Sequence, residues 1–398
     1  MSLTLLLDLD NTLLVNENDR FLPAYFQALS KELAHIVEPK ILVNSLLSAT
    51  SQMMLNQQPE HTLKDVFDAA FYPDIGLSSQ DMQEEFEHFY QDIFPGLQGL
   101  TQAKPEAVKL VEAAFDRGYR VAIATDPLYP RTAIEQRLTW AGLPPDIYPF
   151  ALIPSYEIFH FTKPNPAYYA ELLAYMGWPE GPVLMVGDNI DKDISGAARL
   201  GLATFWVPQP CVTPPDSPGT PTGHGTLDRI LPWIDQMSEQ ELQPEYNMPS
   251  AILATLRSTP AALSNLCSPL TRTAWTKRPK PEEWCPTEIV YHLRDVERDV
   301  NLPRLEKVLH EENPFLAGKD TDPWAEQRDY RSQDGPLGLQ GFIAARKEVL
   351  SLLDPLPQQS WQRPARHAIF GPTTVEELAG IIAGHDRLHI QQIKDAIE

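Results

Sequence analysis

The sequence has 398 residues, which is long enough for two or three domains with separate hydrophobic cores. Its formal net charge of −22 excludes nucleic acid and anionic membranes as expected partners, because an acidic surface repels phosphate groups at long range. Any phosphate-binding site must then be local and assisted by a metal ion.

Cysteine usage and hydropathy indicate a cytoplasmic protein. The three cysteines, Cys211, Cys267 and Cys285, are widely spaced and contain no CxxC pair, so no disulfide framework is expected. The apolar run Leu5–Leu7 has no basic leader and ends at Asp8, too early for a signal peptide. No apolar stretch approaches the length of a membrane span, so no membrane partner is expected. The oligomeric state is not readable from the sequence.

The first predicted element is an apolar strand that stops at two carboxylates, Asp8 and Asp10. Alternate residues of a strand share a face, so the two carboxylates can converge where the strand runs into a loop. One carboxylate could attack a phosphorus or carbon centre there while the other transfers protons. Taken alone, the segment is explained at least as well by a strand followed by an Asx-type turn.

A long helical stretch follows, over about residues 15–100, because apolar residues recur at steps of three and four. The helices predicted there are Phe21–Val37, Pro39–Asn56, Thr62–Ala70 and Ser78–Ile93. The pattern then changes to alternating strands and helices, which predicts a parallel sheet covered by helices on both faces. The fold class expected for this part is α/β, a doubly wound parallel sheet with a helical cap inserted after its first strand.

The alternating part contains four predicted strands and four predicted helices. The strands are Tyr119–Ala124, Phe150–Ile153, Val183–Val186 and Ala203–Val207. The helices are Pro105–Arg117, Arg131–Ala141, Pro166–Met176 and Asp191–Leu200.

A segment rich in Pro, Gly and Thr, about residues 208–225, lacks periodicity and predicts a loop or a disordered excursion. One more helix of the same domain, Thr226–Met237, is predicted after it, so we place the domain boundary near Ser238–Pro249. Beyond the boundary we expect an all-α four-helix bundle without strands. Its predicted helices are Pro249–Leu266, Pro286–Glu311, Leu337–Leu353 and Thr374–Ile397. The expected domains are therefore 1–240 and 249–398.

Polar residues of complementary kinds follow four strands of the predicted sheet, at the end where ligands gather. They are Asp8 and Asp10 after the first strand, Thr125 after the second, Lys163 after the third, and Asp188 and Asp193 after the fourth. Mg²⁺ prefers carboxylate oxygens and substrate phosphate, and phosphoryl transfer depends on positioning and charge neutralisation. Each motif alone also fits a turn, a solvated lysine or a helix N-terminus, so only the ordered set supports a phosphoryl site.

This ordered set resembles the haloacid dehalogenase-like (HAD) hydrolase superfamily, over about residues 1–240. The resemblance implies that Asp8 is the nucleophile, which forms an aspartyl-phosphate, and that Asp10 protonates the leaving group and then activates water. It also implies that Thr125 and Lys163 hold the phosphoryl oxygens. The implied Mg²⁺ ligands are Asp8, the backbone carbonyl of Asp10 and Asp188, while Asp193 ligates through water or orients Lys163.

The helical insertion matches the position of the family's cap, which closes over small substrates and excludes water. The family's dehalogenases lack an acid at the position of Asp10, so the resemblance favours a Mg²⁺-dependent phosphatase of a small phosphorylated metabolite. The alternative is a catalytically silent domain that binds or regulates.

Two histidines of the last predicted helix, His385 and His389, are four residues apart, so both imidazoles lie on one face and can chelate a metal ion. His292 lies on the second predicted helix of the same domain and could meet them inside the bundle. The alternative is a structural bundle without metal, because such pairs are common on solvated helices. The segment HDRLH is also similar to the HExxH motif of zinc proteases, but Asp386 replaces its general base, which makes a protease unexpected.

The region 249–398 resembles the DinB-like four-helix metal-binding family, which includes thiol-dependent transferases and isomerases. The resemblance rests on Trp284 ahead of the helix with His292, on Phe370–Thr374 opening the last helix, and on His385 and His389. It implies a second metal site at the three histidines, with Zn²⁺ or Ni²⁺, and leaves a metal-dependent thiol transferase as a further alternative. Cys267 and Cys285 have no readable activating partner, so we expect them to be core or surface residues.

Overall fold

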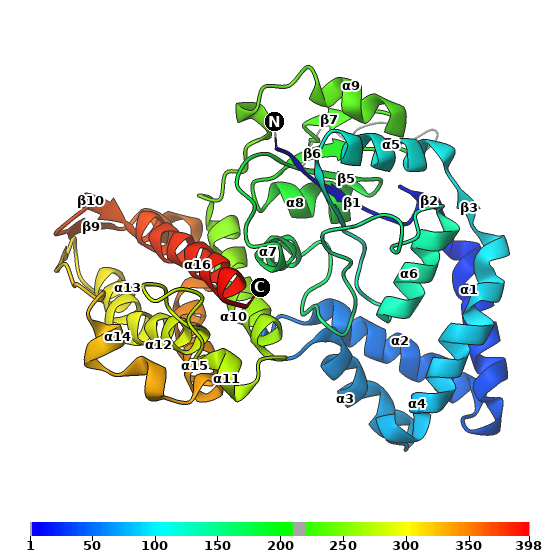
Figure 1. The fold of residues 1–398 in the computed structure, drawn as a ribbon, viewed down its shortest axis with the longest axis horizontal. Helices are drawn as coiled ribbons and strands as arrows, with labels where there is room; N and C mark the ends of the chain where they lie inside the picture. Colours follow the sequence, from blue (N-terminus) through cyan, green and yellow to red (C-terminus); the bar gives the residue numbers. More distant parts are fainter. Residues whose placement is uncertain (1, 210–219, 398) are drawn as a thin grey trace. The chain divides into compact units, whose positions relative to one another are not determined.

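The computed structural model describes residues 2–209 and 220–397, which form two compact units (Figure 1). The first unit is the chain up to Leu172 together with Pro179–Pro244, and the second is Leu173–Trp178 together with the chain from Glu245 onward. Most of the predicted Pro-rich loop, residues 210–219 with Cys211, lies outside the described residues. Among the residues that are described, no helix combines the length and apolarity that crossing a membrane requires.

A five-stranded parallel sheet forms the centre of the first unit, in the order β4-β1-β5-β6-β7. Its strands are β1 (Thr4–Leu7), β4 (Arg120–Ile123), β5 (Val183–Gly187), β6 (Ala203–Trp206) and β7 (Gly223–His224). Strand β1 lies between β4 and β5, with Leu7 paired to Ile123 on one side and to Val186 on the other. Both β1 and β5 are buried along their whole length, as expected for parallel strands covered on both faces. The predicted α/β sheet is confirmed.

The helical insertion leaves the sheet after β1 and returns before β4. A short antiparallel pair joins its two ends, with β2 (Leu14–Val15) against β3 (Gln102–Ala103). Its helices are α1 (Asn18–Glu32), α2 (Pro39–Leu55), α3 (Leu63–Ile75) and α4 (Ser79–His88), drawn in blue and cyan in Figure 1. Capping boxes at Thr62 and Ser78 start α3 and α4. The predicted cap is confirmed, although α3 runs past the expected end at Ala70 and stops only at Gly76, whose φ of 71° is left-handed.

The remaining helices of this unit cover the sheet. They are α5 (Pro105–Asp116), α6 (Arg131–Trp140), α7 (Pro166–Tyr175), α8 (Gly196–Ala198) and α9 (Ile230–Ile234). The predicted helix Asp191–Leu200 starts instead as a π-helical turn, Ile190–Ser195, before α8. The predicted helix Thr226–Met237 is shorter, a 3-10 turn at Leu227–Arg229 followed by α9.

The predicted strand Phe150–Ile153 is wrong. The segment does run beside β4, because Ala151 N–H donates to the Val121 carbonyl (2.7 Å) and Ile123 N–H donates to the Leu152 carbonyl (2.9 Å). Prolines at positions 149 and 154 flank it and have no N–H to donate, which limits the ladder to these two hydrogen bonds.

Helices form most of the second unit, as expected. Its helices are α10 (Pro249–Cys267), α11 (Arg272–Trp275), α12 (Pro286–Val296), α13 (Leu302–His310), α14 (Trp324–Gln327), α15 (Gly335–Leu353) and α16 (Val375–Ile397). The single helix predicted over Pro286–Glu311 is α12 and α13 joined by a π-helical turn, Glu297–Asn301. The four-helix bundle is confirmed.

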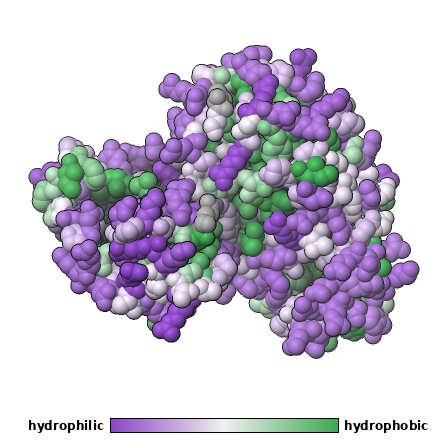
Figure 2. All heavy atoms as spheres, viewed as in Figure 1, coloured by the Kyte–Doolittle hydropathy of each residue, from purple (hydrophilic) through white to green (hydrophobic). Residues whose placement is uncertain are grey.

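The expectation that this unit contains no strands is wrong. A small sheet in the order β10-β9-β8 is present, built from β8 (Phe315–Leu316), β9 (Pro364–His367) and β10 (Gly371–Thr374). Strands of two to four residues are at or below the shortest length at which alternation can be recognised in a sequence. The segment predicted to open the last helix is therefore mostly β10, and the helix starts at Val375. Apolar side chains reach the surface at the β9–β10 hairpin, where Ile369 is 71% exposed (Figure 2).

One buried arginine, Arg346 of α15, makes polar contacts with residues in or next to the other three long helices, α10, α12 and α16. Its guanidinium pairs with Glu297, just after α12, and with Asp386 of α16, where Nη2 donates to Oδ1 at 2.9 Å. Nη1 also donates to the Leu256 carbonyl of α10 at 3.0 Å. Burial lowers the pKa of Arg346, but the two carboxylates outweigh it and hold the pKa above its usual value.

Candidate active site and candidate metal centre

The carboxylate of Asp8 lies directly after β1, at the carboxyl end of the sheet, and is buried. It accepts hydrogen bonds from Lys163 Nζ (2.7 Å) and from Thr12 Oγ1 (2.9 Å). Lys163 Nζ also donates to Asp193 Oδ1 at 2.6 Å. Burial lowers the pKa of Lys163, but the charges of Asp193 and Asp8 outweigh it and keep that pKa well above its usual value. The lysine is therefore a fixed cation between two carboxylates.

Three carboxylates converge beside this lysine. Oxygens of Asp8, Asp188 and Asp193 lie within 4.8 Å of one another. Asp188 directly follows β5, and Asp193 is held in the next turn by Asn189 N–H, which donates to Oδ2 at 2.9 Å. A Cβ atom at Gly187 would lie 2.3 Å from the Asp193 carboxyl group, so this approach requires glycine.

The electrostatics of this cluster fit a divalent cation. Burial, and then the charge of Asp8, raise the pKa of Asp188 to about 6 and that of Asp193 to about 7. The three carboxylates, two of them buried and Asp188 partly buried, face the cations of Lys163 and Lys104, which leaves an excess of negative charge. Oxygen ligands with excess negative charge are the donor set that Mg²⁺ prefers. The residues present therefore fit the metal ion that the sequence implied.

Asp10 points to a different partner from Asp8. Its carboxylate pairs with Arg137 of α6 and accepts a hydrogen bond from Asn16 Nδ2 at 2.8 Å. Arg137 is buried, and burial lowers its pKa to about 10, so it remains a cation near neutral pH. Its Nε is buried without a hydrogen-bond partner among the described residues. Sequence reasoning did not find Arg137, because an arginine within a helix carries no local signal.

Replacing Arg137 with Met is expected to lower kcat about ten- to a hundredfold for a reaction in which Asp10 transfers a proton, because Asp10 loses the cation that orients it. The free energy of unfolding should change less than for a fully buried pair, since the Asp10 side chain is 30% exposed. Steady-state kinetics beside thermal unfolding would measure both. Arg131→Met, at the exposed start of the same helix, is the matched control. Equal kinetics in the two variants would show that Arg137 does not position Asp10.

The other predicted site residue, Thr125, is buried at the end of β4, and its carbonyl accepts a hydrogen bond from Tyr168 Oη at 2.7 Å. Two further residues near the site, Gln209 and Lys104, were not predicted from the sequence. Gln209 Nε2 donates to Asp188 Oδ2 at 3.2 Å, and Lys104 Nζ donates to the Asn11 carbonyl. Both come from segments far from the motifs in the sequence, so no spacing could have predicted them.

A cavity of about 720 Å³ opens beside Asp10 and Arg137. Side chains from the cap helices α1, α2, α3 and α4 form much of its lining, and the core contributes residues such as Asp126 and Tyr129. A cavity of this size is typical of small-molecule sites. It therefore gives a substrate access to Asp10 from beneath the cap.

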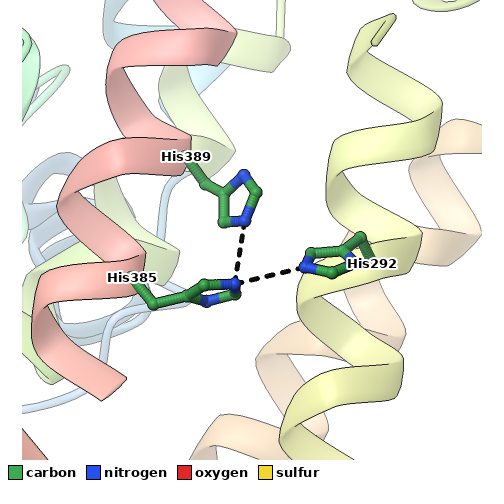
Figure 3. Close-up of side chains that lie close together, drawn as sticks. All are labelled: His292, His385 and His389. Carbon is green, nitrogen blue, oxygen red and sulfur yellow. Dashed lines mark hydrogen bonds between the residues drawn. The ribbon is translucent and has the colours of Figure 1, made fainter. Parts of the chain in front are cut away.

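In the second unit, the three predicted histidines meet between α12 and α16 (Figure 3). His385 Nε2 lies 3.2 Å from His292 Nε2 and 3.0 Å from His389 Nε2. Burial, followed by the neighbouring imidazoles, lowers the pKa of His292 to about 3; burial, then His389 and Arg346, lowers that of His385 to about 3. Burial also lowers the pKa of His389, so all three rings are neutral near pH 7.

Protons alone do not satisfy this arrangement. His389 Nδ1 lies 2.8 Å from Gln392 Oε1, and an Nδ1–H that donates to this oxygen leaves a lone pair on Nε2. An N–H at His385 Nε2 could serve only one of its two neighbours. A metal ion bound tetrahedrally by imidazoles separates their nitrogens by about 3.4 Å, close to the observed distances. The three residues therefore fit a divalent metal ion.

Trp284, Asp386 and the two described cysteines complete the account of the residues considered for this site. Trp284 packs against His292 and His389, with ring centroids 4.8 and 6.1 Å apart. Asp386 is buried against Arg346, so it does not supply the base of a protease motif. Burial raises the pKa of Cys267 to about 12 and that of Cys285 to about 11, so neither thiol is poised as a thiolate.

The chain thus combines a capped α/β domain, which carries a carboxylate cluster, with a helical bundle that carries three histidines. The family model for haloacid dehalogenase-like hydrolases matches residues 3–201, half of the chain, so the chain belongs to this family. The model for the DinB superfamily matches residues 255–393. The chain is thus a HAD-like hydrolase domain fused to a DinB-like bundle.

Individual relatives are distant. A protein of Oceanobacillus iheyensis, which bears the name of a candidate metal-dependent hydrolase, is 29% identical over 110 residues. These make up 28% of this chain and 63% of that protein, so the chain spans less than two thirds of this relative. YfiT from Bacillus subtilis, described with an unusual four-helix bundle topology, is 21% identical, with a TM-score of 0.35, over 41% of this chain and 89% of that chain. A HAD phosphatase from Thermococcus onnurineus is 21% identical, with a TM-score of 0.39, over 60% of this chain and 100% of that chain.

Proposed function

We propose that the N-terminal domain, about residues 1–240, is a Mg²⁺-dependent phosphatase of small phosphorylated molecules that works through an aspartyl-phosphate. The observation that carries this proposal is the buried Asp8 carboxylate. It is held by Lys163 and lies within metal-binding reach of Asp188 and Asp193. A carboxylate fixed in this way can attack phosphorus without first having to be ordered.

In the proposed reaction, Asp8 attacks the phosphorus, the bond from phosphorus to the leaving oxygen breaks, and Asp10 protonates that oxygen. Asp10 then takes a proton from water, which attacks the aspartyl-phosphate and releases phosphate. Asp8, the backbone carbonyl of Asp10 and Asp188 would hold Mg²⁺, which neutralises charge on the phosphoryl oxygens. Lys163 and Thr125 would hold these oxygens from the other side. Arg137, which pairs with the Asp10 carboxylate, would hold it in place for both proton transfers.

The test is hydrolysis of a panel of phosphomonoesters by the full-length protein, with and without Mg²⁺. We expect turnover that requires the added metal ion and disappears in Asp8→Asn. No turnover of any ester, with the metal ion present, would favour the alternative of a catalytically silent binding domain.

For the C-terminal domain, about residues 249–398, we propose a divalent metal site at His292, His385 and His389, with Zn²⁺ or Ni²⁺ as candidates. The convergence of three neutral imidazoles supports this proposal. Three protein ligands leave positions open, as in sites that bind water or substrate. No cysteine of the described residues is activated, so a thiol transferase at this site would have to take its thiol from a second substrate.

Replacing His385 with Ala is expected to reduce the metal content from about one ion per chain to a small fraction of that, because two ligands remain from three. Elemental analysis after reconstitution and desalting measures this directly. His310→Ala, on the exposed end of α13, is the matched control and should keep its metal ion. Wild-type protein that retains no divalent ion would contradict the metal site and leave a structural bundle.

A further inference from the structure

Aromatic rings form a substantial part of the lining of the cavity beside Asp10. Partly exposed rings from the cap and the core face it, among them Phe26, Phe67, Phe86, Tyr90, Tyr129 and Tyr156. These rings pack on one another edge to face, as Phe67 does on Tyr156 at 6.3 Å and Tyr129 does on Tyr25 at 5.7 Å. The apolar surface they leave open is available to a ligand with a complementary ring.

The cations of this cavity are already paired with protein carboxylates. Lys64 pairs with Asp68, Lys192 with Asp126 (2.7 Å), and Arg137 with Asp10. Two more carboxylates in the lining, Glu87 and Glu157, add negative charge. The cavity thus offers no uncompensated cation to a second anionic group of a substrate, so the part of the substrate that fills it carries no anionic group.

The volume leaves room for a substrate much larger than its phosphate group. At about 720 Å³ the cavity holds a body of several ring atoms with its substituents. Burial raises the pKa of both Tyr129 and Tyr156, so their hydroxyls stay protonated and can donate hydrogen bonds to neutral polar groups on that body.

We propose that the substrate is a phosphomonoester of an alcohol that carries an aromatic ring and no further anionic group, with the ring bound among Phe67, Tyr129 and Tyr156. This inference rests on the proposed phosphatase function and specifies its substrate class. The phosphate lies at Asp8, and the aromatic body extends past Asp10 into the cavity beneath the cap.

Four primary alkyl phosphates test this inference with the full-length protein and Mg²⁺. They are ethyl phosphate, 2-phenylethyl phosphate, 2-cyclohexylethyl phosphate and 2-(4-carboxyphenyl)ethyl phosphate, which separate size, aromaticity and charge at a similar leaving group. We expect kcat/KM for the phenyl ester to exceed that for ethyl phosphate about a hundredfold and that for the cyclohexyl ester about three- to tenfold. The carboxylated ester should be at least about tenfold poorer than the phenyl ester.

A matched pair of variants tests whether the aromatic ring of the substrate binds beside Phe67. Phe67→Leu keeps an apolar side chain and should remove the preference for phenyl over cyclohexyl, while Phe115→Leu should keep it. Phe115 is a partly buried aromatic residue of the same domain that does not line the cavity. Calorimetric binding of the same esters to Asp8→Asn gives the ranking without turnover.

The outcomes separate the two proposals. No turnover of these four esters or of any ester of the wider panel would overturn the phosphatase function, and the substrate class with it. Turnover of other esters of that panel but of none of the four would overturn the substrate class alone. Turnover in which ethyl phosphate or the carboxylated ester equals or exceeds the phenyl ester would overturn the substrate class alone. A phenyl preference that survives unchanged in Phe67→Leu would overturn the placement of the ring.

Discussion

Replacing Asp8 with Asn is expected to lower kcat by at least about 10⁴-fold, because the amide cannot act as the nucleophile that accepts the phosphoryl group. The fold should persist, since Lys163 keeps its hydrogen bond to Asp193 and the substitution relieves repulsion among the three carboxylates of the cluster. We expect the free energy of unfolding to change by less than about 2 kcal/mol. Initial rates on the best ester, beside denaturant unfolding, measure the two effects separately.

The matched control is Asp116→Asn, on the exposed end of α5, which makes the same chemical change away from the site. Its rate should equal that of the wild type. If Asp8→Asn kept more than about a tenth of wild-type kcat while its fold was intact, Asp8 would not be the nucleophile, and a directly attacking water would replace it.

The largest stability effect is expected in the bundle, for Arg346→Met. The substitution leaves Glu297 and Asp386 buried without their cation, and removing one member of a buried ion pair costs about 3–5 kcal/mol. Asp386 adjoins His385, so loosening it should also disturb the three histidines. Hydrogen exchange of peptides from α12, α15 and α16 would report the loss for this unit alone.

Arg257→Met serves as the control, because Arg257 pairs with Asp354, which is 41% exposed. Exposed pairs contribute about 0–1 kcal/mol, so exchange in this variant should stay close to wild type. Equal exchange in the two variants would show that the Arg346 cluster does not hold the bundle together.

The positions of residues that follow strand ends could be predicted from the sequence. Asp8, Thr125 and Asp188 each come after an apolar run, and the topology of a parallel sheet then brings them to one edge. The spacing of His385 and His389 likewise fixed their common helix face. Local patterns with a known geometry were therefore enough to predict the sheet, the cap, the bundle and the residues of both clusters. The chemical roles of these residues remain predictions.

The roles of residues that depend on a partner far away in the sequence could not be predicted. Arg137 lies within an ordinary helix, and only its contact with Asp10 makes it part of the site. Arg346 reads as a solvated helix residue, yet it is buried against carboxylates of two other helices. The aromatic lining of the cavity is a further case, because rings such as Phe67 and Tyr129 are brought together only by the packing of the cap on the core. Pairings of this kind need the three-dimensional structure.

The central claim, covalent phosphorylation of Asp8, is tested most directly by trapping the intermediate in Asp10→Asn. This variant lacks the base that activates water, and 4-nitrophenyl phosphate needs little help from an acid to release its leaving group. After incubation with this ester and Mg²⁺ and an acid quench, peptide mass spectrometry should find one phosphoryl group on Asp8. The double variant with Asp8→Asn should carry none. Wild-type turnover of the ester without any phosphorylated Asp8 in Asp10→Asn would contradict the claim.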